Sequence, residues 1–189
     1  MSNLQLTCPP RGRFIAVVGP SGAGKDSVMD GLCARVPELH RARRVITRAA
    51  DAGGEAFEAV TEAEFQSRAK AGAFALHWTA HGLSYGIPIE VRATLATGRD
   101  VLANLSRGVL AQALHAFGSA VVLHVTAPPD ILAQRLAARG RELGADAQRR
   151  LSRPAPQMPE GLSLVTIDNS GTLERSVETA LAALYPDRG

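Results

Sequence analysis

Residues 19–26 read Gly-Pro-Ser-Gly-Ala-Gly-Lys-Asp, which fits the spacing Gly-x-x-x-x-Gly-Lys of a phosphate-binding loop. The glycines let backbone N–H groups converge on a phosphate, and the lysine bridges two phosphates of a nucleotide. An apolar run at 13–18 predicts a buried strand before the loop, and Val28, Leu32 and Val36 predict a helix after it. This context predicts a P-loop that binds ATP. The expected ATP-binding residues are Gly19, Pro20, Ser21, Gly22, Ala23, Gly24, Lys25, Asp26 and Ser27.

The residue after the lysine departs from the usual motif. Ser or Thr normally stands there and binds magnesium, whereas this chain has Asp26 followed by Ser27. A carboxylate can ligate magnesium, directly or through water, because hard cations prefer oxygen ligands. We therefore predict Asp26 and Ser27 as the metal ligands. An acidic residue also stabilises the first turn of a helix, and this structural role carries equal weight for Asp26.

The rest of the chain alternates between strand and helix patterns, which predicts an α/β fold with a parallel sheet flanked by helices. Thr61 and Glu64 form a capping-box pattern that opens one helix, and Pro88 predicts the start of another. A turn is expected at 81–86. Residues 139–153 are basic and interrupted by glycine, which suits a lid over phosphates. Further strands are expected at 43–47, 73–79, 100–104, 120–126 and 163–168, and a closing helix at 172–184.

Length and composition favour one soluble domain. The 189 residues are 46% hydrophobic and 21% charged, and residues 1–13 lack the apolar stretch of a signal peptide. No run approaches the roughly 18 apolar residues of a membrane span, so we expect a cytoplasmic protein that does not bind membranes. The formal net charge is +3, but the basic residues are spread along the chain. This pattern favours small anionic substrates over nucleic acid.

Four segments together resemble the guanylate kinase superfamily. They are Gly-Pro-Ser-Gly at 19–22, Ile-Thr-Arg at 46–48, Tyr-Gly at 85–86 and the arginine-bearing segment 135–151. The resemblance covers nearly the whole chain. It implies one guanylate kinase-like domain over 1–189, of the nucleoside-monophosphate-kinase type. A substrate-binding insertion is then expected at about 41–86 and a lid at about 139–153.

The positions that read guanine in that superfamily do not match. Arg44 stands where a serine is expected, Leu76 replaces a glutamate and Leu105 replaces an aspartate. Each leucine would leave a buried guanine donor unpaired, at a cost of about 1–3 kcal/mol. Asp51 replaces a second phosphate-binding arginine, and Phe57 stands where Tyr or His is expected. These differences argue against GMP as the acceptor.

The same substitutions resemble the ribose 1,5-bisphosphate phosphokinases of bacterial phosphonate catabolism. The resemblance implies that ATP phosphorylates ribose 1,5-bisphosphate on its 1-phosphate, giving 5-phosphoribosyl 1-diphosphate (PRPP) and ADP, with Mg²⁺ as the metal. The similar segments are Gly-Lys-Asp-Ser at 24–27, Arg-Val-Ile-Thr-Arg at 44–48, Ala-Gly-Gly-Glu at 52–55, His-Trp-Thr-Ala-His-Gly-Leu-Ser-Tyr-Gly at 77–86 and Asn-Leu-Ser-Arg at 104–107.

Residue roles follow from the resemblance. Lys25, Arg139 and Arg150 are expected to be catalytic. Glu55 either hydrogen-bonds a ribose hydroxyl or has no such role. Expected substrate-binding residues are Arg44, Arg48, Tyr85, Asn104, Arg107 and Arg153. Residues that are either functional or ordinary surface and packing groups are His77, His81, Arg135 and Arg141, while Trp78 is expected in the core.

Two rival functions remain open at this point. One is a divergent guanylate kinase or another small-metabolite kinase of the same fold. The other is a non-catalytic guanylate kinase-like binding module, although such modules typically have a degraded phosphate loop and this loop is intact through Lys25.

Overall fold

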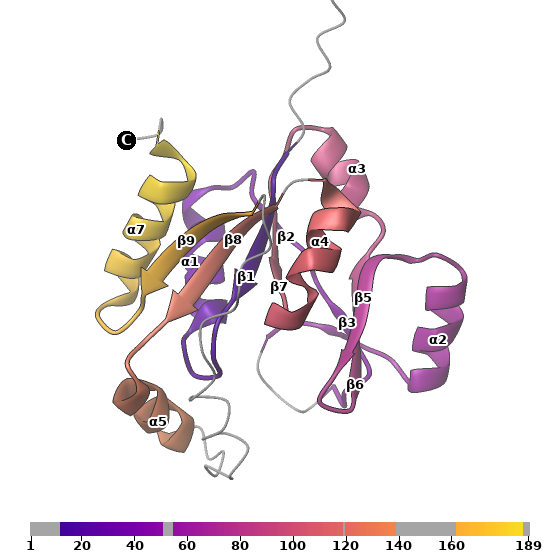
Figure 1. Ribbon diagram of the computed structural model, residues 1–189, viewed down its shortest axis with the longest axis horizontal. Helices are drawn as coiled ribbons and strands as arrows, with labels where there is room; N and C mark the ends of the chain where they lie inside the picture. Colours follow the sequence, from indigo (N-terminus) through magenta and orange to yellow (C-terminus); the bar gives the residue numbers. More distant parts are fainter. Residues whose placement is uncertain (1–11, 51–54, 119, 139–161, 187–189) are drawn as a thin grey trace, which may run out of the picture.

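The computed structural model describes residues 12–50, 55–118, 120–138 and 162–186. Five parallel strands form the central sheet in the order β2-β7-β1-β8-β9 (Figure 1). This arrangement confirms the predicted α/β fold. The strands are β1 (Phe14–Val18), β2 (His40–Arg41), β7 (Val101–Asn104), β8 (Ala120–Thr126) and β9 (Ser163–Asp168).

Strand β1 is apolar throughout because the sheet is covered on both faces. All five of its residues are fully buried. Phe14, Ala16 and Val18 point into one core cluster, and Ile15 and Val17 point into the other. In Figure 1, α1 and α7 lie on one side of the sheet and α3 and α4 on the other. Their bounds are α1 (Lys25–Arg35), α3 (Val91–Ala96), α4 (Leu110–Phe117) and α7 (Leu173–Leu184).

A second sheet of four strands stands beside the central one in the order β4-β3-β6-β5, with α2 (Glu62–Lys70) next to it (Figure 1). Trp78 and Ile87 from this sheet enter the same core cluster as β1, so the two sheets share packed side chains. The predicted capping box at Thr61 and Glu64 is present and opens α2. The strands are β3 (Val45–Ile46), β4 (Glu58–Ala59), β5 (Phe74–Ala80) and β6 (Leu83–Pro88).

The connection from β5 to β6 differs from the prediction. The turn comprises only His81 and Gly82, which both have positive φ, at 54° and 74°. Two-residue turns of this kind match the twist of the flanking strands. Pro88 was predicted to open a helix, but it ends β6, and α3 begins at Val91. The pairing of β6 with β5 continues to Pro88, which lies opposite Phe74 beside an irregularity between Phe74 and Leu76. A proline has no N–H to donate and is tolerated at such a bulge.

The short strands β2 and β4 were not predicted. Each has two residues, which is too short for any periodicity to register. The predicted strand at 43–47 narrows to Val45–Ile46 and joins the second sheet instead of the parallel one. Among the described helices, none is long and apolar enough to cross a membrane. The remaining helical elements of the described residues are η1 (Arg107–Val109) and α5 (Pro129–Ala138).

Candidate active site

The phosphate loop leaves the carboxyl end of β1 and is held by backbone geometry. Gly22 and Gly24 have φ of 85° and 82°, a conformation that L side chains rarely adopt. A side chain at Gly24 would begin 2.4 Å from Nδ2 of Asn169. That amide, buried after β9, donates a hydrogen bond of 2.8 Å to the carbonyl of Ala23. The loop is thus held by the side chain of Asn169, which follows β9 and is 146 residues away in the sequence.

Lys25 is the first residue of α1, and its side chain turns back over the loop. Nζ donates to the carbonyl oxygens of Gly19 at 3.1 Å and Pro20 at 3.0 Å. Burial lowers the pKa of Lys25 to about 8, and Arg44 and Arg107 add to this while Asp26 and Glu55 oppose it. Nearby anionic phosphates would restore the charged form. Lys25 therefore lies where it can move from two carbonyls to nucleotide phosphates.

Asp26 pairs with a cation in the structure. Its Oδ1 accepts from Nη2 of Arg41 at 2.9 Å, and the same guanidinium pairs with Asp30 one helical turn later. Ser27 is exposed. Within the described residues, no group of three His, Cys, Asp or Glu side chains could hold a metal ion. A site of one carboxylate plus substrate phosphates and water suits Mg²⁺, which keeps several waters, so Asp26 fits this metal.

Arg135 on α5 reaches the phosphate loop. Its Nη1 is buried without a hydrogen-bond partner and lies 4.0 Å from where a Gly24 side chain would begin. A buried donor without a partner is costly, and an anionic ligand beside the loop would supply one. The sequence left this arginine undecided between a ligand contact and a solvated charge. The position of Nη1 favours the contact and fits a bound nucleotide.

A cavity of about 700 Å³ opens beside the loop. Three walls enclose it: the loop and Lys25, the β5–β6 hairpin, and the segment that follows β7. The Lys and Arg side chains among the described lining residues are Lys25, Arg44 and Arg107, and none of those lining residues is Asp or Glu. Such a lining suits an anion with more than one charged group. The remaining lining residues are Gly19, Pro20, Ser21, His77, Trp78, Thr79, Ala80, His81, Tyr85, Asn104, Leu105, Ser106, Gly108, Val109 and Gln112.

Arg44 is buried at the hairpin side of this cavity. Its Nε donates to Oε2 of Glu55 at 3.1 Å, and its Nη2 pairs with Oε1 of the same carboxylate. Its Cζ lies 5.0 Å from the centre of the Tyr85 ring and 6.0 Å from that of Trp78. The two rings are stacked with centroids 5.3 Å apart, and the Trp78 indole N–H donates to Ser106 at 2.9 Å. Trp78 is thus both a core residue, as predicted, and a wall of the cavity.

Two of the expected substrate-binding residues, Arg48 and Tyr85, line different hollows. Tyr85 lines the central cavity, whereas Arg48 lines a neighbouring groove of about 650 Å³ with Thr47 and Glu62. Cζ of Arg48 lies 5.5 Å from the ring of Phe57. The structure therefore does not bring Arg48 and Tyr85 together in one lining.

Other predicted substrate contacts converge on the cavity. Asn104, at the end of β7, is buried, and Arg107 opens η1. Leu76 and Leu105, which stand at the guanine-reading positions, are 7% and 4% exposed, and Leu105 lines the cavity. Leu105 therefore presents an apolar side chain to the cavity where the superfamily resemblance would place an acceptor for guanine.

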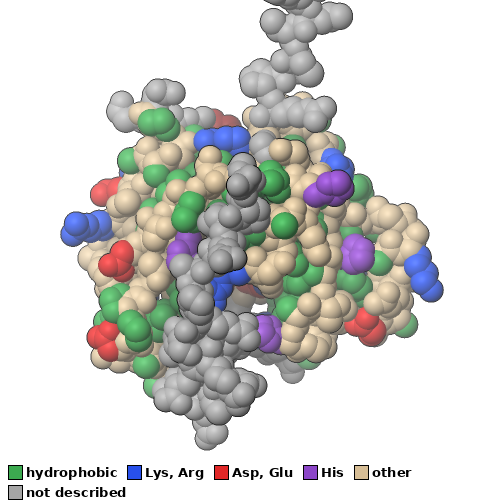
Figure 2. Space-filling model, viewed as in Figure 1, with side chains coloured by type: hydrophobic (Ala, Val, Ile, Leu, Met, Phe, Trp, Pro, Cys, Tyr) green, Lys and Arg blue, Asp and Glu red, His purple; other side chains and the backbone are tan. Residues whose placement is uncertain are grey.

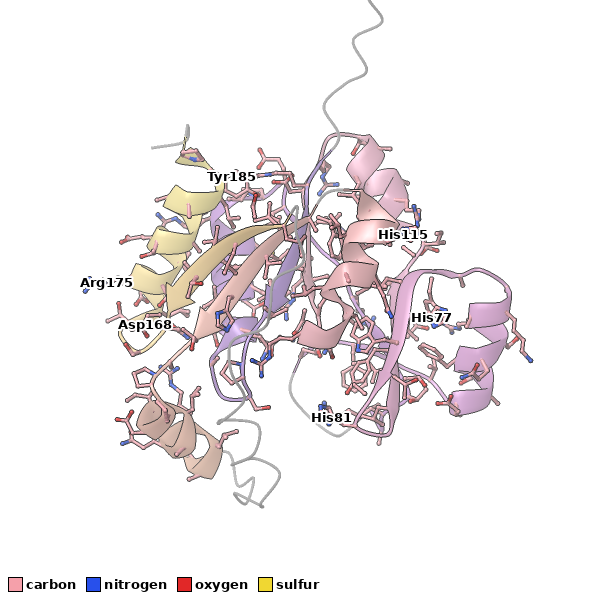
Figure 3. All side chains as sticks on the ribbon, in the orientation of Figure 1. His77, His81, His115, Asp168, Arg175 and Tyr185 are labelled. Carbon is pink, nitrogen blue, oxygen red and sulfur yellow. The ribbon has the colours of Figure 1, made fainter. Side chains whose placement is uncertain are left out.

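His77 and His81 both line the cavity, but they lie at different places along the hairpin. Figure 3 shows His77 in the space between β5 and α2, and its ring lies 6.3 Å from Phe65 and 6.1 Å from Phe74. His81 lies at the hairpin tip and lines the cavity. His124, near the end of β8, was not among the predicted site residues; its pKa is lowered by burial and by the charges of Arg107 and Lys25. No short motif marks His124, so only the fold could place it here.

Arg139, Arg141, Arg150 and Arg153 lie outside the described residues, as does Asp51. Among the described residues on the face in Figure 2, the Lys and Arg side chains lie apart from one another instead of forming one basic field.

No protein-family model matches the chain. Solved structures share its fold: a guanylate kinase from Anaplasma phagocytophilum has a TM-score of 0.66 at 16% identity, covering 94% of this chain and 87% of that one. An unliganded sugar kinase from Janibacter sp. HTCC2649 has a TM-score of 0.53 at 20% identity, covering 92% of this chain and 94% of that one. At such identities these similarities concern the fold alone.

Curated relatives are much more similar in sequence. Ribose 1,5-bisphosphate phosphokinase PhnN of Ruegeria sp. (strain TM1040) is 51% identical over 183 residues, covering 96% of both chains. PhnN of Agrobacterium fabrum is 46% identical over 93% of this chain and 98% of its own. A bifunctional ribose 1,5-bisphosphokinase-thymidine phosphorylase of Cupriavidus pinatubonensis is 50% identical over 92% of this chain, which spans 29% of that longer protein. Similarity of this degree over the full length of the first two relatives shows that the chain belongs to the ribose 1,5-bisphosphate phosphokinase family.

Proposed function

We propose that this chain is an ATP-dependent kinase that phosphorylates the 1-phosphate of ribose 1,5-bisphosphate to give PRPP and ADP. The observation that carries the acceptor is the cavity beside the phosphate loop, whose described lining contains Lys25, Arg44 and Arg107 and no Asp or Glu. A sugar with two phosphates complements such a lining, while a purine base does not. Family membership supports the same acceptor.

The reaction needs little covalent chemistry from the protein. An oxygen of the 1-phosphate is already an anion near neutral pH, so it can attack the γ-phosphorus without a general base. The bond from that phosphorus to the β-γ bridging oxygen breaks, and ADP leaves. Catalysis then consists of positioning and charge neutralisation. Lys25 supplies charge from the loop wall, and we assign the same task to Arg139 and Arg150 of the lid.

The donor is held by the loop. Residues 19–27 bind the ATP phosphates, and the buried Nη1 of Arg135 supports a further contact beside Gly24. We assign Asp26, with Ser27, to Mg²⁺, which would offset charge on the phosphates when bound. Arg41 forms an ion pair with Asp26.

The acceptor is held by the remaining walls. We assign Arg44, Tyr85, Asn104 and Arg107 to ribose 1,5-bisphosphate, and all four line the cavity. Arg48 and Arg153 complete the proposed set of substrate-binding residues. Arg48 lines the neighbouring groove, so its side chain would have to move to reach a phosphate bound in the cavity. We regard 1–189 as one guanylate kinase-like domain, with an insertion at about 41–86 and a lid at about 139–153, acting on small molecules in the cytoplasm.

Measurement of ADP release with either ribose 1,5-bisphosphate or GMP as acceptor tests the proposal. We expect turnover with the bisphosphate, and at least about 30-fold lower kcat/KM with GMP, because two unpaired guanine donors together cost about 2–6 kcal/mol. Turnover with GMP alone would identify a divergent guanylate kinase. Turnover with neither acceptor would favour a binding module.

A further inference from the structure

Arg44 is a buried cation of the cavity that other side chains hold in place. Its side chain is 9% exposed, and that of its partner Glu55 is 10% exposed. One edge of the guanidinium, Nε and Nη2, is engaged by the carboxylate, and its plane lies near the stacked rings of Trp78 and Tyr85. We propose that Arg44 binds the 5-phosphate of the acceptor and that Glu55 is the residue that positions Arg44 for it. This inference rests on the proposed function.

The chemistry of the acceptor requires two anion sites. The 1-phosphate must meet the γ-phosphate of ATP, so it lies against the loop wall, where Lys25 begins α1. The 5-phosphate is attached to the other side of the furanose ring, so it needs a cation on a different wall. Arg107 opens η1, the next element after β7, so it belongs to the wall formed by the central sheet. Arg44 directly precedes β3 of the second sheet, so it lies on a different wall.

The contact to Glu55 orients Arg44 more than it strengthens the local positive charge. A buried ion pair is close to neutral and costs desolvation, so its benefit here is directional. Because Glu55 holds the Nε and Nη2 edge, the edge that carries Nη1 is the one left to meet a ligand in the cavity. The stacked rings of Trp78 and Tyr85 lie near the guanidinium of Arg44, and Trp78 is itself held by its hydrogen bond to Ser106. These rings limit rotation of the guanidinium plane. A phosphate needs such a fixed fork for two parallel hydrogen bonds.

The first test compares two acceptors that differ only in the 5-phosphate. Initial rates are measured with ribose 1,5-bisphosphate and with α-D-ribose 1-phosphate for wild type and Glu55→Gln. We expect Glu55→Gln to lower kcat/KM for the bisphosphate about 10- to 100-fold, mainly through KM. The same parameter for ribose 1-phosphate should stay within about twofold. Glu58→Gln is the matched control, since its pair with Arg68 is exposed, and it should change neither acceptor.

The second test needs no turnover. Replacing Arg44 alone would leave a buried carboxylate unpaired, so the variant is the double change Arg44→Gln and Glu55→Gln, with Arg43→Gln as the control because Arg43 bonds only the Phe57 carbonyl in the described contacts. Ribose 5-phosphate is titrated calorimetrically into each protein. Wild type and the Arg43→Gln control should bind it, and the double variant should bind at least about tenfold more weakly.

The two proposals fail in distinguishable ways. Absence of wild-type turnover with ribose 1,5-bisphosphate would defeat the proposed function, while binding of ribose 5-phosphate would still report on Arg44. Equal losses for both acceptors in Glu55→Gln would overturn the inference, because Arg44 would then serve the part that the acceptors share. Unchanged affinity for ribose 5-phosphate in the double variant, or no binding by wild type, would overturn it as well.

Discussion

The phosphate loop and the β5–β6 hairpin are two walls of one cavity, but different forces hold them. The loop is shaped by backbone, through Gly22, Gly24 and the amide of Asn169 on the Ala23 carbonyl. The hairpin wall is shaped by side chains, through the Arg44–Glu55 pair and the Trp78–Tyr85 stack. A backbone-built site can serve any nucleoside triphosphate, whereas a side-chain-built site can change its ligand by a few substitutions. The comparison therefore predicts that donor and acceptor parameters respond to different mutations.

Removing the charge of the loop wall should have the largest effect. Lys25→Met is expected to lower kcat roughly 10²- to 10³-fold, because a preorganised charge on the transferring group is lost. The chain has one other lysine, Lys70, which is exposed at the end of α2 and provides the control Lys70→Met. Steady-state rates and a thermal melt for both variants check this. A Lys25→Met enzyme with near-normal kcat would show that the loop is not the donor site.

The next effect concerns the metal. Asp26→Asn is expected to raise the Mg²⁺ concentration for half-maximal activity about 10- to 100-fold, as loss of a direct or water-mediated metal contact does. Asp30→Asn is the control, because Asp30 pairs with the same Arg41 one turn later. A magnesium titration at saturating ATP measures both. Unchanged magnesium dependence in Asp26→Asn would leave this residue with its helix-dipole role alone.

A smaller effect is expected on ATP binding. Arg135→Leu should weaken ATP binding about tenfold, the weight of one charge-assisted hydrogen bond. The ligand-free protein should be as stable as wild type or more stable, because the change removes a buried donor without a partner. Thermal melts with and without ATP give both quantities, and Gln134→Leu on the exposed face of α5 is the control. Loss of stability without ATP would assign Arg135 a structural role.

The smallest effect is a dependence on pH. The pKa of Lys25 is about 8 in the ligand-free fold, below its ordinary 10.5, so Nζ loses its proton as pH rises through 8. Phosphates favour the charged form, so ATP binding must take up a proton above that pH. The dissociation constant for ATP should therefore rise about threefold from pH 7.5 to 8.5. Calorimetry in buffers of different ionisation enthalpy measures this, and a flat profile in wild type would contradict it.

The two walls also differ in what the sequence revealed. The loop lies within consecutive residues, so its motif, strand and helix were all predictable, as were β8, β9 and α7. Arg44 and Glu55 are eleven residues apart, and the described residues between them contribute only the two-residue strand β3, so no local pattern joins them. The approach of Arg135 to Gly24 was equally unpredictable from the sequence, because the two residues lie far apart along the chain. Contacts between side chains that are distant in sequence are decided by packing.

The choice of acceptor is the central claim, and phosphorus NMR follows it most directly. The enzyme is incubated with ATP, Mg²⁺ and an equimolar mixture of ribose 1,5-bisphosphate and GMP. The account predicts that the 1-phosphate resonance is replaced by the coupled pair of a diphosphate, one ADP forms per PRPP, and GMP stays unchanged. Conversion of GMP to GDP while ribose 1,5-bisphosphate persists would contradict it.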